Sequence, residues 1–318
     1  MRREIEDTNT YKRLISDANI YLAIYSLESY IFNKELLSDG DKELLNQLRD
    51  KFNEKLIGSV TKQVKKVLRK LATDENSFIE ASVYFKPKKY NEKDGKIEFR
   101  PLHTTRIVQQ IAAVSILNLF IYEPYEKNGK LVLSNISRLI PENFYGNRVS
   151  TRPEVLFKPW KTQYKKYTQI ANDLFKTYHE TREYNYEVDL DLEDFFPSVN
   201  IRRVYRQILD LLPVTIQGEE RNAYKALLIK LLVCKIDNLG KNTMGLYYRD
   251  KYYEGQTNYG MGIAQGLPQS YFLGNICMIE IARIFEKYFP GKSLFYVDDS
   301  VIFCNDISGM EDFTKRLN

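Results

Sequence analysis

The chain has 318 residues, 43% hydrophobic and 28% charged, so it can bury a sizeable core and disorder is not expected. Its 47 Lys and Arg exceed its 42 Asp and Glu by five, which describes a mildly basic protein rather than a polycation. Two histidines and three cysteines without CxxC or CxxH spacing argue against a structural zinc site and a disulfide framework. The start lacks a signal-peptide core and the most apolar stretch, 111–122, is too short to span a bilayer, so we expect a cytoplasmic protein without a membrane partner.

The N-terminal part of the chain has the periodicity of helices. From Asp17 to about Leu71 apolar residues recur at helical spacing, with one interruption at 38–40. This pattern favours a helical hairpin or a small helical domain. Two further helices are predicted over about 105–122 and 157–175, separated by a loop-rich region.

A segment typical of a β-hairpin precedes the first of these two helices. Residues 78–89 alternate in the manner of a strand, and a second short strand ends at Phe99-Arg100. Lys93-Asp94-Gly95 supplies the turn, because aspartate and glycine tolerate the backbone angles of tight turns. We therefore predict a hairpin directly ahead of the long helix.

The chemistry of the sequence changes at residue 183. Residues 183–199 contain six acids and no lysine or arginine. Aliphatic residues and acids alternate within this segment, as Val188, Asp189, Leu190, Asp191 and Leu192. The alternation predicts a strand with acids on one face and aliphatic side chains on the other.

The last third of the chain is predicted to mix helices with one hairpin. The helices are expected over about 201–212, 219–235 and 270–288, with a glycine-rich stretch at 254–266. Residues 293–304 contain two β-rich runs joined at Asp298-Asp299, which is typical of a tight hairpin with carboxylates at its tip. Taken alone, an Asp-Asp pair is more often a solvated turn.

Asp191 and the pair Asp298-Asp299 form the chemical centre of the sequence. Clustered carboxylates repel one another and need compensating cations, and Mg²⁺, which takes oxygen ligands, is the usual one. Two such ions can activate a 3′-hydroxyl and stabilise an in-line phosphoryl transfer. This chemistry needs few side chains besides the acids, so an enzyme is compatible with the shortage of histidine and cysteine.

Three segments resemble the palm motifs of reverse transcriptases, in the family's order. The segment similar to motif A is Asp191-Leu192-Glu193-Asp194-Phe195-Phe196, that similar to motif B is Gln265-Gly266-Leu267-Pro268-Gln269-Ser270 followed by Leu273 and Asn275, and that similar to motif C is Tyr296-Val297-Asp298-Asp299. The resemblance implies an α+β fold, with the fingers and the βαββαβ-type antiparallel palm of a right-hand polymerase behind a helical N-terminal region. It also implies an RNA-directed DNA polymerase, a nucleotidyltransferase with two Mg²⁺ ions or, in their place, Mn²⁺.

The resemblance assigns the catalytic residues. Asp191 and Asp298 would bind both metal ions, with Asp299 in support. Asp189 lies on the same strand face, but Asp191 is preferred because the Phe-Phe pair follows it at the motif's distance. Phe196 would lie beneath the nucleotide sugar and clash with a 2′-hydroxyl, which implies selection of dNTPs.

Other residues are expected around the nucleotide. Gln265 and Gly266 would shape the floor of the site, Gly266 because backbone must approach closely there, and Tyr296 would touch the primer end. Arg100 lies in a hairpin that resembles the fingers hairpin, and a guanidinium matches triphosphate oxygens bidentately. Weaker candidates for phosphate contacts are Lys86, Lys88 and Arg106.

Segment 145–166 holds six Lys and Arg against one acid, with four aromatic residues among them. Such a mixture suits a nucleic-acid strand, since cations meet phosphates and rings stack on bases. An amphipathic helix with a solvated basic face is the alternative. The residues expected to bind nucleic acid are Arg148, Arg152, Trp160 and Lys165.

Tyr-Gly-Asn-Arg at 145–148 and Arg-Pro-Leu-His at 100–103 resemble the abortive-infection and "unknown group" reverse transcriptases of bacterial phage defence. This likeness implies a role in antiviral defence, with RNA, DNA and dNTPs as ligands and a non-coding RNA or a second protein subunit as a further partner. Oligomerisation is open. Since some members of that group make DNA without a template or start from a protein hydroxyl, templated, template-independent and protein-primed synthesis all stay open.

The expected organisation is a helical N-terminal region over 1–75, fingers with the basic segment over 76–182, and a palm over 183–318. The family's palm closes with another strand and continues into a thumb, and neither follows here, so we expect an incomplete palm that belongs to a longer protein. A catalytically retired RNA-binding scaffold is disfavoured, because a retired site has no need of clustered acids. An RNA-dependent RNA polymerase is disfavoured by Phe196.

Overall fold

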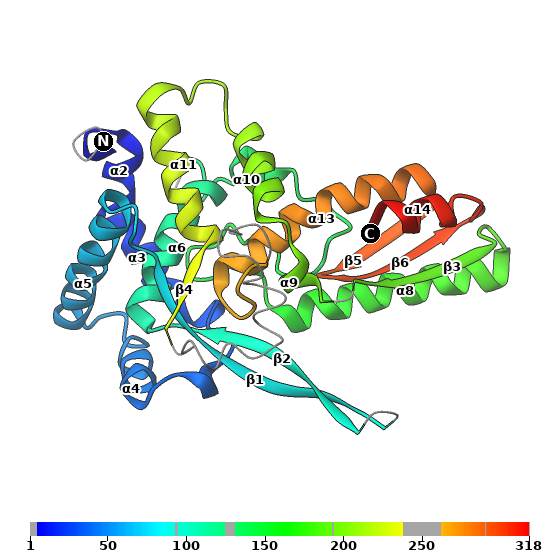
Figure 1. The fold of residues 1–318 in the computed structure, drawn as a ribbon, viewed down its shortest axis with the longest axis horizontal. Coiled ribbons are helices and arrows are strands. Elements are labelled where there is room, and N and C mark those ends of the chain that lie inside the picture. Colours follow the sequence, from blue (N-terminus) through cyan, green and yellow to red (C-terminus); the bar gives the residue numbers. More distant parts are fainter. Residues whose placement is uncertain are drawn as a thin grey trace.

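The computed structural model describes residues 5–92, 95–124, 131–192, 194–237, 262–289 and 291–317. Within these ranges the chain forms an α+β fold of helices and two three-stranded sheets. The predicted turn residues Lys93 and Asp94, Glu193 of the acidic segment and most of the glycine-rich stretch 254–266 lie outside them. Figure 1 shows an elongated molecule, with the N-terminal helices at one end and the sheet formed by residues 186–191 and 291–304 at the other. The long β-hairpin of residues 79–104 lies between them.

The predicted helices are confirmed, with bounds shifted by a few residues. The helices of the described residues are α2 (Asn9–Leu14), α3 (Asp17–Tyr25), α4 (Asp39–Gln47), α5 (Glu54–Thr73), α6 (Ile107–Ile121), α7 (Asn135–Arg138), α8 (Trp160–Thr181), α9 (Phe195–Ser198), α10 (Ile201–Asp210), α11 (Gly218–Leu232), α13 (Pro268–Tyr288) and α14 (Met310–Leu317), with short 3₁₀ turns at Leu27–Ser29 and Lys34–Leu36. Of these, α2, α7 and α9 lie outside the predicted helices. The predicted interruption at 38–40 is the start of α4, because the Ser38 hydroxyl accepts a hydrogen bond from the Asp41 amide and caps the helix.

Helix α6 is the centre of the N-terminal half. It is apolar on every side and packs against α2, α3, α5, α11 and α13. Two buried hydrogen bonds join it to α3: the Asn118 amide donates to Asn19 Oδ1 at 3.1 Å, and Asn19 donates to the Ser115 carbonyl at 2.9 Å. These bonds fix the register of α6 against α3. Nowhere in the described ranges does a helix combine the length and apolar character that crossing a membrane requires.

The first sheet contains the predicted hairpin. Strands β1 (Ile79–Asn91) and β2 (Lys96–Thr104) pair antiparallel, with Lys86 opposite Arg100, and β4 (Cys234–Ile236) pairs parallel to β1. The register of β1 against β2 shifts between Pro87 and Lys89, which gives the strands an irregularity close to their basic residues.

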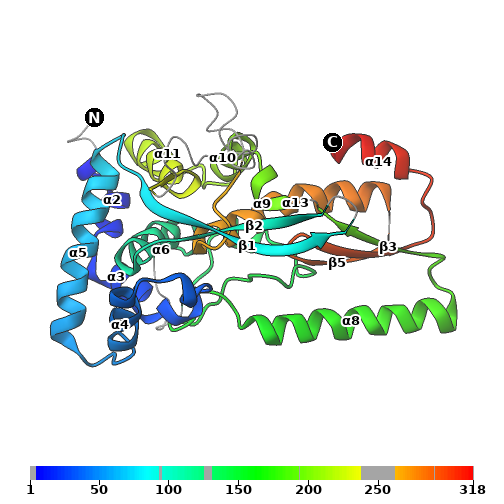
Figure 2. The ribbon, with the colours of Figure 1, turned by 60° about the horizontal axis from the view of Figure 1, so that its bottom comes forward.

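The second sheet has the strand order β3-β6-β5, all antiparallel, from β3 (Tyr186–Asp191), β6 (Asp299–Cys304) and β5 (Gly291–Tyr296). Helix α13 covers one face, where Phe285 stacks on Phe295 with ring centroids 5.5 Å apart. Helix α8 runs along the opposite face (Figure 2), where Val301 and Phe303 pack against residues of α8. The sheet is therefore a middle layer between two long helices.

The segment 143–147 closes the outer edge of β5. The Tyr145 amide donates to the Phe295 carbonyl at 2.8 Å, and the Phe295 amide donates to the Asn143 carbonyl at 3.0 Å. The Asn275 side chain of α13 then donates to the carbonyls of Gly146 and Asn147 at 3.0 and 3.2 Å. The loop-rich region of the sequence thus becomes a fixed part of the sheet.

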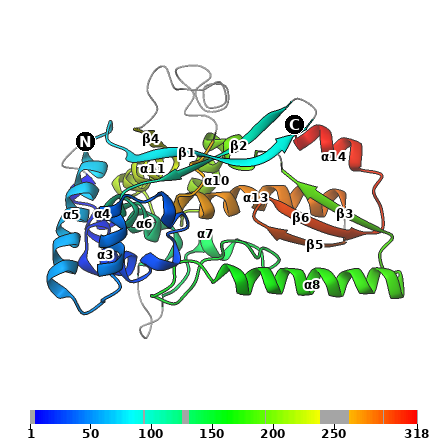
Figure 3. The same cartoon turned by 90° about the horizontal axis from the view of Figure 1, so that it is seen from below.

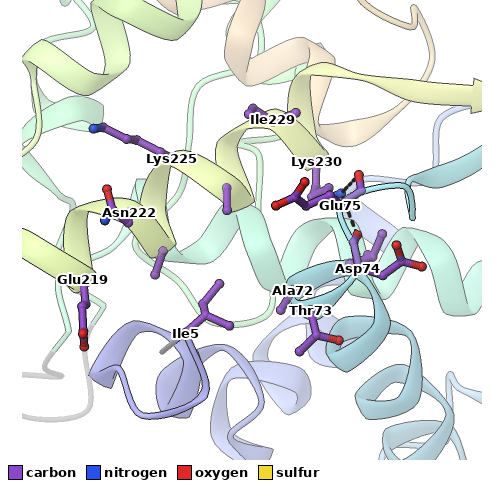
Figure 4. Close-up of a pocket in the computed structure, with 13 residues that line it drawn as sticks. Ile5, Ala72, Thr73, Asp74, Glu75, Glu219, Asn222, Lys225, Ile229 and Lys230 are labelled. Atoms are coloured by element: carbon purple, nitrogen blue, oxygen red, sulfur yellow. Dashed lines mark hydrogen bonds between the residues drawn. The ribbon is translucent and has the colours of Figure 1, made fainter. Parts of the chain in front are cut away.

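The end of α5 and helix α11 enclose a groove of about 820 Å³ at the other end of the molecule. Figure 4 shows Lys230 at its inner end, with its ammonium group turned toward the chain that follows α5. The group donates to the carbonyls of Asp74, Glu75 and Ser77 at 3.1, 2.8 and 2.7 Å, and it lies 4.3 Å from the centre of the Phe78 ring. The side chain therefore clamps the entry to β1 onto α11.

Replacing Lys230 by methionine should lower the free energy of unfolding by about 2 kcal/mol, because the volume is kept while the carbonyls lose a charged donor. Urea unfolding followed by circular dichroism measures this change. The matched control is Lys225→Met on the same helix, since Lys225 lines the groove but is only half-buried and should change stability by less than about 0.5 kcal/mol. Equal stability of the two variants would contradict the clamp.

Candidate active site

A polar cavity of about 340 Å³ lies where the β1–β2 hairpin meets the end of the second sheet. Its polar lining comes from Lys88, Arg100, Asp191, Asp194, Gln265, Asp298 and Asp299, and its apolar wall includes Phe99, Phe195 and Phe196. These residues come from the hairpin, from β3 with the turn and helix α9 that follow it, from the turn before α13, and from the β5–β6 turn with the first residue of β6. The structure therefore brings together residues that lie about 200 positions apart in the sequence.

Strand pairing places the carboxylates. Asp191 is the last residue of β3 and lies directly opposite Asp299, the first residue of β6, so their side chains emerge on the same face of the sheet. Asp298 lies in the preceding turn and is half-buried. Asp189 shares this face but lies opposite Val301, two residues farther along β3 from the turn, and it does not line the cavity. The predicted alternation of β3 is confirmed, with its acids exposed and its aliphatic residues half-buried.

The tip of the hairpin differs from the prediction by one residue. The turn consists of Val297 and Asp298, whereas Asp299 belongs to β6 and pairs with Tyr296. Val297 has a left-handed backbone conformation with φ of 62°, which is costly for a β-branched residue. Gly146 packs directly on this turn, since a β-carbon there would lie 2.6 Å from Val297 Cγ2. The segment 143–147 thus supports the strained turn that carries Asp298.

The electrostatics of the cavity favour a bound cation. Burial and then the charges of Asp299 and Asp191 raise the pKa of Asp298 above its ordinary value, whereas Arg100 acts in the opposite direction. Burial and the charge of Asp191 likewise raise the pKa of Asp299. Mutual repulsion of this kind is relieved when a cation binds among the carboxylates.

The opposite wall carries positive charge. Arg100 and Lys88 line the cavity from the hairpin, and Lys86, which pairs with Arg100 across the strands, does not. Arg106 lies at the start of α6 and lines a different cavity. Of the basic residues proposed from the sequence for phosphate contacts, the structure thus places Arg100 and Lys88 with the carboxylates. Such a site can hold an anionic ligand against its cationic side chains, across the cavity from the acids.

Phe196, Gln265 and Gly266 form the wall and floor. Phe196 is buried, with its ring against Phe195 and Tyr271. The Gln265 carbonyl accepts hydrogen bonds from the His103 amide at 2.7 Å and from His103 Nδ1 at 3.0 Å. Because a carbonyl only accepts, Nδ1 carries the proton. Gly266 has φ of 109°, and a β-carbon there would lie 2.5 Å from the His103 carbonyl oxygen.

His103 makes stability depend on pH. Its side chain is 1% exposed, and burial lowers its pKa from 6.5 to about 4. The unfolded chain therefore binds a proton on His103 as the pH falls below about 6.5, while the folded protein does not until about pH 4. We expect about 3 kcal/mol of stability, present above pH 6.5, to be lost as the pH falls to 4. Urea unfolding at several pH values should show a shallower loss for His103→Asn, and equal slopes would contradict the assignment.

A group of three tyrosines adjoins the carboxylates, and we call it the tyrosine ledge: Tyr164 and Tyr167 of α8 and Tyr296 of β5. The Tyr296 ring lies 5.2 Å from that of Tyr164 and 5.6 Å from that of Tyr167. Burial, followed by the charges of Asp299 and Asp189, raises the pKa of Tyr167 to about 12. Tyr296, predicted to touch a primer end, is thus half-buried under α8 and beside Asp299.

The four residues predicted to bind nucleic acid have different surroundings. Trp160 and Lys165 are exposed on α8, and Arg152 is exposed and lies 3.8 Å from Glu154. Arg148 is half-buried, and its guanidinium group donates to the Pro141 and Phe144 carbonyls, the latter at 2.7 Å. Its position therefore serves the loop that closes β5.

The lining of the cavity bears on the metal ions that the sequence implies. Among the described residues, no group of three or more His, Cys, Asp and Glu side chains is arranged as a ready chelate. The donor chemistry nevertheless fits Mg²⁺, because Asp191, Asp298 and Asp299 line one cavity with oxygen ligands and repel one another. These three residues would hold the ions.

Some residues of the site were not predicted in their observed roles. Asn275 belongs to the segment similar to motif B, but its bonds to segment 143–147 give no local sequence signal. His103 likewise supports the Gln265-Gly266 backbone from a strand about 160 residues away in the sequence. Comparison of the chain with protein-family models and with curated proteins gives no match.

Proposed function

We propose that the protein is a DNA polymerase of reverse transcriptase type, which adds dNTPs to a 3′-hydroxyl. The observation that carries the proposal is the cavity in which Asp191, Asp298 and Asp299 face Arg100 and Lys88. Carboxylates suit catalytic metal ions, and cationic side chains suit a triphosphate, so the two walls match the two ends of a nucleotidyl transfer.

The arrangement of elements supports this assignment. We assign the second sheet, with α10, α11 and α13 in the connection from β3 to β5, to a polymerase palm, and the β1–β2 hairpin to the fingers. Helices α2 to α5 form the helical N-terminal region. The likeness of residues 145–148 and 100–103 to phage-defence enzymes supports a cytoplasmic role in antiviral defence, with an RNA or a protein subunit as partner.

Each wall of the cavity has a part in the reaction. Arg100 and Lys88 bind the triphosphate and orient it toward the acids. Phe196, held by Phe195 and Tyr271, fills the space beside the sugar and excludes a 2′-hydroxyl. Bound Mg²⁺ would activate the attacking hydroxyl and neutralise the charge that develops on the phosphates.

Incubation of the protein with labelled dNTPs or rNTPs, with Mg²⁺ and with or without added RNA and a DNA oligonucleotide, tests the proposal. We expect incorporation of dNTPs and exclusion of rNTPs. Loss of incorporation after RNase treatment would indicate templated synthesis, and label attached to protein would indicate a protein primer. Absence of incorporation with RNA and DNA present, in Mg²⁺ and also in Mn²⁺, would overturn the polymerase and leave an RNA-binding scaffold.

A further inference from the structure

Helix α8 limits how nucleic acid can reach the carboxylates. It runs along the face of the second sheet that carries Asp189, Asp191 and Asp299, on the side opposite α13 (Figure 3). Under α8 this face is filled by an apolar cluster: Tyr184, Leu294, Val301 and Phe303 of the sheet region against Tyr145, Tyr167, Ala171, Leu174 and Tyr178. A nucleic-acid strand therefore approaches the carboxylates at the end of the sheet, where the β5–β6 turn lies.

The tyrosine ledge stands at this open end. Tyr296 pairs directly with Asp299, so the ledge adjoins the cavity. The Tyr164 ring meets Tyr296 edge to face, at an interplanar angle of 81°, and its side chain is 48% exposed. The Tyr167 ring centre lies 6.3 Å from that of Tyr164 and 5.6 Å from that of Tyr296, and this side chain is half-buried. Of the three rings, that of Tyr164 offers the most surface to a ligand.

The charge around the ledge suits a phosphate backbone. Lys161, Lys165 and Lys166 of α8 are exposed, and residues 155–172 contain no acid. Trp160, at the start of the helix, is 58% exposed. A base stacks on an aromatic ring whatever its identity, and lysines nearby hold the phosphates. An aromatic ring with these neighbours, next to metal-binding acids, is suited to the end of a single strand.

We propose that Tyr164 is a positioning residue for the 3′ end of a single DNA strand. The last base stacks on Tyr164, beside Tyr296, and Lys161 and Lys165 contact the phosphates behind it. The 3′-hydroxyl is thereby held next to Asp299 and Asp191. That this end reacts rests on the proposed function, whereas its binding to the ledge does not.

Photo-cross-linking locates the strand without catalysis. A DNA oligonucleotide with 5-iododeoxyuridine at its 3′ end is bound to the whole chain in EDTA, irradiated, and mapped by mass spectrometry. We expect cross-links in the peptide that contains Tyr164, and their loss when the iodinated base is moved ten nucleotides upstream. Cross-links that leave the residues of the tyrosine ledge unlabelled would overturn the proposal.

Substitutions separate stacking from folding. Tyr164→Ala should weaken binding of the oligonucleotide about tenfold by fluorescence anisotropy and raise KM for DNA more than it lowers kcat, because a stacked base contributes about 1–3 kcal/mol. Tyr164→Phe keeps the ring and should bind as the wild type does. The control is Ile170→Ala, an exposed residue farther along α8.

The outcomes also distinguish this proposal from the polymerase itself. Incorporation of dNTPs with unchanged binding and KM in Tyr164→Ala would overturn the role of Tyr164 and retain the polymerase. Cross-linking at Tyr164 in a protein that incorporates no nucleotide would retain the binding role and overturn the polymerase.

Discussion

Asp191→Asn should lower the rate of dNTP incorporation by at least about 1000-fold. The amide keeps the shape of the carboxylate but removes the negative charge that a catalytic metal ion needs. Asp191 pairs with Asp299, and both residues line the cavity. Single-nucleotide extension at saturating dNTP and Mg²⁺ measures the rate. Because Asp191 is exposed and repels its neighbours, the melting temperature should stay the same or rise.

The matched control is Asp189→Asn, which makes the same change on the same strand and face. Asp189 lies opposite Val301 and outside the cavity lining, so its variant should keep the wild-type rate within about threefold. If Asp189→Asn were inactive and Asp191→Asn active, the two assignments would have to be exchanged. Full activity of both would remove Asp191 from the reaction.

Gly266→Ala should lower the free energy of unfolding by about 3 kcal/mol and reduce nucleotide binding. The backbone at Gly266 has φ of 109°, and the added β-carbon would lie 2.5 Å from the His103 carbonyl oxygen and 2.7 Å from Asn33 Nδ2. The His103 carbonyl oxygen cannot move without breaking the hydrogen bonds from His103 to the Gln265 carbonyl, which hold the backbone at the floor of the cavity in place. Urea unfolding measures the stability.

Gly58→Ala is the control, because Gly58 lies inside α5 and a β-carbon there meets nothing within 4 Å. The helix should gain about 0.5–1 kcal/mol from this change. The two variants should therefore change the free energy of unfolding in opposite directions. A neutral Gly266→Ala would show that the floor does not depend on the close approach.

The sequence predicted the second sheet well because its signals are local. Alternation of acids and aliphatic residues identified β3 and the face that its acids occupy, and two β-rich runs identified β5 and β6. The turn was displaced by one residue because Asp-Asp is a common turn pair, whereas a left-handed Val297 is rare. That conformation depends on packing by Gly146, which no neighbouring residue reveals.

The surroundings of the site were less predictable because they depend on tertiary packing. The pattern of 157–175 predicts a helix. The apolar residues of this helix do not indicate which surface of the protein they cover, so the sequence does not predict that α8 lies on the carboxylate face of the sheet. Arg148 shows the same limit. Its positive charge and its basic neighbours predict a contact with nucleic acid, whereas in the structure its guanidinium group donates hydrogen bonds to the carbonyls of Pro141 and Phe144.

The hydrogen bonds between segment 143–147 and β5 also determine where the second sheet can grow. An open strand edge is a template for further pairing, and this segment already occupies that of β5. In the part of the chain that the structure describes, the outer edge of β3 has no neighbouring strand. A further strand, from the same chain or from another molecule, is therefore directed to β3, the strand that carries Asp191, so that β-augmentation there would adjoin the carboxylates of the cavity.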